Sequence, residues 1–197
     1  MKKISSISIA ALSLLLICSC DNDGTTTTGN ADSGNADKVD NTNGQPPASP
    51  IVATDEETSS FLKEAADGGM AEVRLGEMAL QKSTNQRVKN FANMMVTDHS
   101  GANSKVKSFA SERNITLPTD VSDKHKETMD DLMKKEGKDF DKAYVKAMVE
   151  DHEKDIKKFE DAEGKVNDAT VKNFITATLP VLRTHLDSIK AIQKAIR

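Results

Sequence analysis

Cysteine, tryptophan and tyrosine are scarce in this chain of 197 residues, which has two cysteines, no tryptophan and one tyrosine. Both cysteines lie within the first twenty residues, so the rest of the chain forms no disulfide, thiolate metal site or cysteine nucleophile. A formal net charge of −4 and the lack of tryptophan argue against nucleic-acid binding. Gly-x-Ser-x-Gly, phosphate-binding glycine loops and His-Glu-x-x-His are also absent. These absences favour binding over catalysis.

The first nineteen residues have the layout of a bacterial lipoprotein signal. Two lysines precede an apolar run over residues 4–17, which is too short to span a bilayer. The tripeptide Ile-Cys-Ser ahead of Cys20 resembles a lipobox, in which the final cysteine is acylated and becomes the first residue of the mature protein. We therefore predict a signal peptide over residues 1–19 and a lipid anchor at Cys20. The alternative is a plain secretory signal that is cleaved nearby.

A polar segment separates this signal from the rest of the chain. Residues 20–53 are rich in Asp, Asn, Gly, Thr and Ser and contain no aromatic residue, so they cannot bury enough apolar surface to fold. We predict a disordered tether with a reach of roughly 30 Å. It would hold a folded domain, residues 54–197, at the inner or outer membrane of a bacterial envelope. The lipid provides the membrane contact, and an envelope protein partner and the oligomeric state are left open.

Long segments with helical spacing follow the tether, with few glycines or prolines to interrupt them. Apolar residues recur at intervals of three and four in four long segments and one shorter one. The predicted helices are 55–83, 85–113, 122–135, 139–163, and 168 to near the C-terminus. Their connections are short, long and short, as in bundles that join two helical hairpins through a long crossover. We predict an all-α fold, an antiparallel four-helix bundle of the ferritin-like type, with Pro180 kinking or loosening the last helix.

Several blocks of the sequence, in order, resemble a known family. They are FLKEAADGGMAEVRLGEMALQKSTNQRVKNFANMMVTDHSGAN, ITLP, FDKAYVKAMVEDHEKDIKKFE and LPVLRTHL. Together they span about residues 59–192 and are similar to bacterial envelope proteins that carry the domain of unknown function 4142. The resemblance implies a ferritin-like bundle and a secreted or outer-membrane location. It implies no established activity.

Three of the four histidines lie on the apolar stripes of different predicted helices. His99 and His152 occupy the same Met-Val-x-Asp-His frame, and His185 lies on the stripe of the last helix. In the first helix, Glu72 lies on a stripe of small residues with a glycine about one turn away on each side. Because glycine is costly within a helix, we expect close helix approach or space for a buried group here. His125 lies in the polar crossover, and we expect it to be solvated.

Two main interpretations of these residues remain open, beside a third in which they form a pocket for some other ligand. The first is a mononuclear zinc, iron or copper site. Its ligands would be Glu72, His99, His152 and His185, with Met95 and Met148 as further soft ligands. A di-iron oxidase is not expected, because no histidine has a glutamate three residues before it.

The second interpretation is that the histidines are core groups, satisfied by hydrogen bonds, that set the register of the helices. It is favoured by an axial offset of near 9 Å that the predicted helix bounds give between His152 and His185. Asp98 and Asp151 precede histidines and should point about 100° away from them. We expect the packing interpretation, with no catalytic residue and no certain cofactor.

Overall fold

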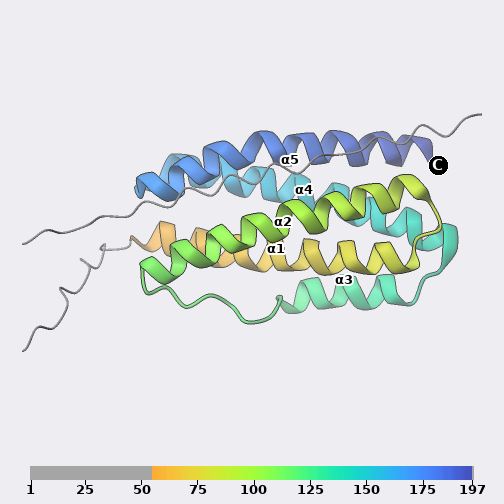
Figure 1. Cartoon of the computed structure of the whole chain (residues 1–197), viewed down its shortest axis with the longest axis horizontal. Coiled ribbons are helices and arrows are strands. Elements are labelled where there is room, and N and C mark those ends of the chain that lie inside the picture. The colour runs from red at the N-terminus through yellow and green to blue at the C-terminus, as the bar shows by residue number, and fades with distance from the viewer. Residues whose placement is uncertain (1–54, 197) are drawn as a thin grey trace, which may run out of the picture. The chain divides into compact units, whose positions relative to one another are not determined.

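The computed structural model describes residues 55–196, and all regular structure in this part of the chain is helical. The helices are α1 (Glu56–Lys82), α2 (Gln86–Glu112), α3 (Asp123–Met133), α4 (Gly137–Lys165) and α5 (Ala169–Ala195) (Figure 1). The predicted all-α bundle is confirmed, and each helix begins and ends within two residues of its predicted bounds. The signal peptide, Cys20 and the tether lie outside the described residues. No helix of the described part is long and apolar enough to cross a membrane.

Side-chain caps fix the starts of three of the long helices. Asp55 accepts a hydrogen bond from the backbone N–H of Thr58 at 2.7 Å, and Asn85 accepts one from Arg87 at 2.9 Å. Asp168 does the same at the start of α5. The turns between α1 and α2 and between α4 and α5 are three residues long, which makes each pair an antiparallel hairpin.

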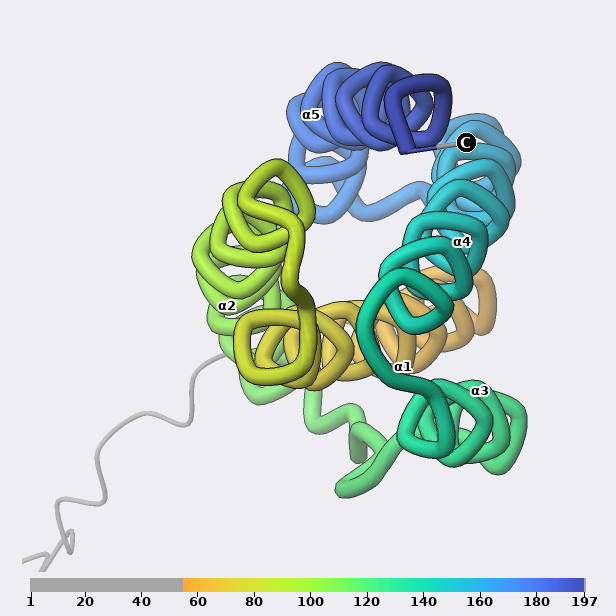
Figure 2. The backbone as a smooth tube through the Cα atoms, turned by 90° about the vertical axis from the view of Figure 1, so that its right-hand side faces the viewer, coloured from red at the N-terminus to blue at the C-terminus, as the bar shows by residue number. Residues whose placement is uncertain are grey.

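The two hairpins pack into a four-helix bundle. Seen along the bundle, α1, α2, α5 and α4 surround the interior in that order, and α3 lies outside them beside α1 and α4 (Figure 2). The long crossover returns the chain to the opposite end, so that α2 and α4 run in the same direction (Figure 1). Pro180 lies inside α5, which is continuous through it. Because Pro180 is exposed, the carbonyl group that loses its helical partner can bond to water.

The bundle interior has two apolar clusters with a polar layer between them. One cluster contains Phe91 and Tyr144, at the end where α1 turns into α2. The other contains Phe61, Phe159 and Phe174, at the opposite end. Along each of the four long helices, Glu72 or one of the buried histidines lies between the residues of the two clusters.

Two glycines of α1 allow the first hairpin to pack closely, as the sequence predicted. A Cβ atom at Gly76 would lie 2.9 Å from Val96 Cγ2 and 3.0 Å from the carbonyl oxygen of Ala92. A Cβ atom at Gly69 would overlap the side chain of Asn103. The backbone of α1 therefore approaches the backbone of α2 at Gly76 and contacts the side chain of Asn103 at Gly69, on either side of Glu72.

Candidate metal centre

The polar layer consists of one side chain from each long helix. They are Glu72 from α1, His99 from α2, His152 from α4 and His185 from α5. All four are buried, Glu72 with 1% and His152 with none of its surface exposed. The three imidazole ring centroids lie 5.4–5.8 Å from one another. Oxygen atoms of Glu72 lie 2.6 Å from His99 Nδ1 and 3.4 Å from His152 Nε2.

The register of the two hairpins brings these groups to one level. Glu72 lies ten residues before the end of α1, and His99 lies thirteen residues after the start of α2. His152 and His185 lie thirteen and sixteen residues from their turn, so the offset is three residues, or about 4.5 Å, in both hairpins. The expected offset near 9 Å between His152 and His185 was wrong, because α4 continues two residues past its predicted end, through Gly164, and α5 begins one residue later than predicted.

Each histidine has one ring nitrogen fixed by a hydrogen-bond acceptor. His152 Nδ1 lies 2.9 Å from the carbonyl oxygen of Met148, and His185 Nε2 lies 2.9 Å from Asp98 Oδ2. His99 Nδ1 faces the Glu72 carboxyl group. A carbonyl or carboxylate oxygen requires the facing nitrogen to carry the proton. In a neutral imidazole the other nitrogen then presents a lone pair.

These second nitrogens have no partner. His99 Nε2, His152 Nε2 and His185 Nδ1 are buried and make no hydrogen bond, and Glu72 Oε1 is in the same state. The three histidines each offer a ring nitrogen within 4.8 Å of the others. The expected hydrogen bonds to Glu72, an aspartate and the backbone are present, one for each ring, whereas the second nitrogen of each ring makes none. An unsatisfied buried polar group costs about 1–3 kcal/mol, so four together in one layer make it a candidate site for a proton, an ordered water or an ion.

The protonation states suit a cation-binding site. Burial lowers the pKa values of His99, His152 and His185, which favours neutral imidazoles with a free lone pair. Burial also raises the pKa of Glu72 well above its ordinary range, although His152 opposes the shift. A proton or a metal ion is therefore needed beside Glu72, because a carboxylate oxygen otherwise faces the lone pair of His152.

A second group of carboxyl side chains lies next to the histidines. Glu72, Asp151 and Asp155 each offer an oxygen within 4.8 Å of the others. Asp155 pairs with Lys158 at 3.2 Å, yet burial and the charge of Asp151 raise its pKa. Burial alone would raise the pKa of Asp151 too. The contact with His125 outweighs this effect, so that the pKa of Asp151 is lowered. Each aspartate therefore has a cationic neighbour, and Glu72 has none.

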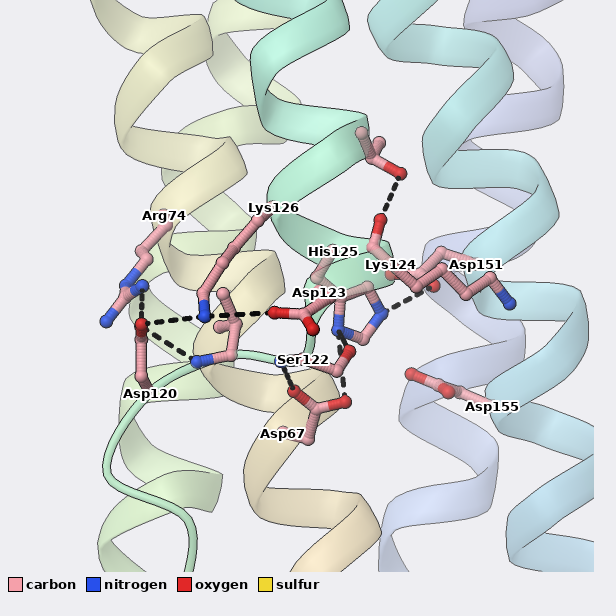
Figure 3. A network of polar contacts seen from close by, with 12 residues as sticks. Asp67, Arg74, Asp120, Ser122, Asp123, Lys124, His125, Lys126, Asp151 and Asp155 are labelled. Atoms are coloured by element: carbon pink, nitrogen blue, oxygen red, sulfur yellow. Dashed lines mark hydrogen bonds and ion pairs between the residues drawn. The ribbon is translucent and has the colours of Figure 1, made fainter.

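His125 is buried, which corrects the expectation that it is solvated. It lies between Asp67 of α1, at 3.2 Å, and Asp151 of α4, at 3.8 Å (Figure 3). Contact with Asp151 raises its pKa and outweighs the opposing effect of burial, so the charged form is favoured. His125 therefore connects the crossover helix α3 to both hairpins and is not part of the histidine cluster.

A cavity of ≈ 50 Å³ adjoins the polar layer. Glu72, His99 and His185 line it together with Asp155 and Lys158 of α4, and His152 does not. Most of the remaining wall is apolar and belongs to the cluster around Phe61 and Phe174. Exposed lining residues, among them Asp98 and Val181, connect the cavity with the surface between α2 and α5.

The other predicted ligands, Met95 and Met148, each lie four residues before one of the histidines. Met95 and Met148 are buried in the apolar cluster around Phe91, and neither lines the cavity. Asp98, in contrast, was expected to point away, yet it fixes the orientation of His185 from the neighbouring helix. Asp155 was missed. It lies three residues after His152, a spacing that places both side chains on one helix face.

Comparisons with known proteins agree with the fold. The sequence model described as Domain of unknown function (DUF4142) matches residues 43–192, and no curated protein matches the chain. The crystal structure of a DUF305 fragment from Deinococcus radiodurans superposes with a TM-score of 0.65 at 9% identity, covering 73% of this chain and 99% of that one. CopM in the Cu(II)-bound form superposes with a TM-score of 0.62 at 14% identity, covering 71% of this chain and 97% of that one. CopM in the Cu(I)-bound form has a TM-score of 0.61 at 14% identity, covering 70% of this chain and 96% of that one. At these identities the likeness shows the fold alone.

Proposed function

The chain belongs to the family of the domain of unknown function DUF4142, and we propose that its bundle is a metal-binding domain that holds one copper ion. The proposed ligands are the ring nitrogens of His99, His152 and His185 and the carboxylate of Glu72. The binding is non-catalytic, and the histidine layer serves to retain the ion within the bundle.

One observation carries this proposal. Three buried imidazoles, each fixed by a hydrogen bond at one nitrogen and unpartnered at the other, each offer a ring nitrogen within 4.8 Å of the others. Protein metal sites orient their histidine ligands in this manner. A tetrahedral ion with bonds of 2.0–2.1 Å separates its ligand atoms by about 3.4 Å. Since the nitrogens lie within 4.8 Å, small movements of each ring close the site.

The charges support one ion rather than two. Asp151 is matched by His125 and Asp155 by Lys158, which leaves Glu72 as the buried carboxyl group without a cationic neighbour. A single copper ion would replace the proton of Glu72 and offset the charge that its loss leaves. A second divalent ion among the carboxylates would have to displace Lys158 or His125, or leave a large positive excess in the bundle interior.

The donor set and the fold both favour copper. Imidazole suits zinc, copper and iron, and Cu(II) has the highest affinity of the divalent first-row ions for a given nitrogen and oxygen site. CopM, which shares this fold, has been solved in Cu(II)-bound and Cu(I)-bound forms. A di-iron site is disfavoured, because the residues three before the histidines are Val96, Val149 and Leu182.

The test is the copper content of the purified protein after incubation with excess Cu(II) and desalting. We expect one copper per chain by elemental analysis, and we expect Cu(II) to displace Zn(II) when both are supplied. The linkage of binding to folding gives a second readout, since copper at 100 times its Kd stabilises the folded state by about 2.7 kcal/mol. Protein that retains no metal and melts at an unchanged temperature would contradict the proposal.

We also propose that Cys20 anchors this domain to a membrane of the bacterial envelope. The proposal is supported by the signal-like first nineteen residues and the lipobox-like tripeptide before Cys20. Cys20→Ser should move the protein from the membrane fraction of the producing bacterium to the soluble fraction. Cys18→Ser is the matched control and should leave it with the membrane. Equal membrane association of both variants would exclude an anchor at Cys20.

A further inference from the structure

We propose that the copper ion enters the bundle between α2 and α5 and is first bound there by the carboxylate of Asp98, which passes it to the histidine layer. This inference rests on the proposed copper site and concerns how the ion reaches it. All four proposed ligands are buried, so an ion from solution needs a path between the side chains of the bundle. The cavity provides one, because Glu72, His99 and His185 line it.

The cavity approaches the surface on two sides of the bundle. On one side its wall includes the exposed residues Asp98 of α2 and Val181 of α5. On the other side it includes Glu64 of α1 and Lys158 of α4, which also line a surface pocket between those helices. Across the interior, α2 and α5 lie opposite α1 and α4 (Figure 2). The cavity therefore offers two routes, and the charges along each decide between them.

The route between α1 and α4 presents a cation to an incoming metal ion. The ammonium group of Lys158 lies 3.2 Å from Asp155, the carboxylate on this side that is nearest in sequence to the histidine layer. Glu64 is exposed here as well, and its charge also acts on Lys158. A metal ion that follows this route would have to pass or displace a like charge, which opposes its entry.

The route between α2 and α5 presents a carboxylate that already contacts a proposed ligand. The side chain of Asp98 is 41% exposed, and its Oδ2 atom lies 2.9 Å from His185 Nε2. Within residues 55–196 no lysine or arginine forms an ion pair with Asp98. Oxygen and nitrogen ligands together suit Cu(II). An ion held by Asp98 at the surface is thus close to His185, and the next residue of α2 is a second proposed ligand, His99.

The experiment measures two rates, Cu(II) association with the metal-free protein by stopped-flow absorption and copper release to a chelator. Asp98→Asn removes the charge and keeps an oxygen that accepts the hydrogen bond of His185 Nε2–H. We expect it to slow association about tenfold at low salt, with release within about threefold of the parent. Added salt should narrow the difference in association, because it screens exposed charges.

Two further variants change the net charge by the same amount at other positions. Val181→Lys adds a positive charge on the proposed route and leaves Asp98 and all four ligands in place, so it should also slow association about tenfold. Glu64→Gln is the matched control, because it removes an exposed carboxylate from the other route. We expect it to associate at the rate of the parent protein.

The outcomes separate the route, the role of Asp98 and the copper site itself. Association that is as slow in Glu64→Gln as in Asp98→Asn overturns the route between α2 and α5, and so does unchanged association in Val181→Lys. Faster release with unchanged association in Asp98→Asn means that Asp98 only orients His185, which overturns its role in capture. Parent protein that binds no copper contradicts the proposed function instead.

Discussion

Alanine in place of His99, His152 or His185 is expected to lower copper affinity more than 100-fold, whereas His125→Gln should leave it within about threefold. Loss of a hydrogen-bonding partner behind a ligand costs about 10–100-fold in affinity, and loss of the ligand costs more. Each of the three histidines has an unpartnered nitrogen and offers a ring nitrogen within 4.8 Å of the others. His125 instead lies between Asp67 and Asp151 and does not line the cavity.

The measurement is a competition titration against a copper chelator, with the melting temperature of each metal-free variant as a check of folding. Asp98→Ala gives an intermediate case, since Asp98 contacts His185 Nε2 and not the proposed ion. We expect it to lower affinity by about 10–100-fold. Equal losses in all variants, with His125→Gln among them, would mean that general destabilisation accounts for the effect. That result would support the interpretation of the histidines as core packing groups rather than metal ligands.

The helices and the identity of the buried polar residues could be predicted from sequence. Apolar residues at intervals of three and four, short turns and polar caps place each helix within two residues. His99, His152, His185 and Glu72 stood out because each is polar on an otherwise apolar or small-residue stripe. Local periodicity is sufficient for this, since it reports which face of a helix is buried.

The relations between helices could not be predicted in the same way. An error of two residues at the end of α4 and one at the start of α5 doubled the apparent offset between His152 and His185, from about 4.5 to about 9 Å. Asp98 contacts His185 because α2 and α5 are adjacent, which no pattern within α2 reports. His125 lies in a polar segment, and its burial depends on how α3 packs against two aspartates.

Glu72→Gln is expected to change the stability of the protein in opposite directions with and without copper. Without metal, and at pH values where Glu72 is ionised, the introduced amide keeps an oxygen acceptor for His99 Nδ1–H and adds N–H donors near Nε2 of His152, 3.4 Å from the present carboxylate. Satisfying buried polar groups should stabilise the metal-free fold by about 1–3 kcal/mol, or raise Tm by about 4–10 °C. With copper, removal of a charged ligand should abolish most of the metal-induced rise in Tm.

The pH dependence distinguishes this explanation from a general packing effect. Because burial raises the pKa of Glu72 in the folded protein, the folded state keeps a proton that the unfolded chain releases. The stability of metal-free protein therefore falls as pH rises from the ordinary carboxyl pKa through the raised pKa of Glu72. Glu72→Gln has no such proton to lose, so its advantage in Tm should widen over that window. An advantage that is constant with pH would mean that Glu72 ionises at an ordinary pKa, and the buried carboxylate would then need no ion beside it.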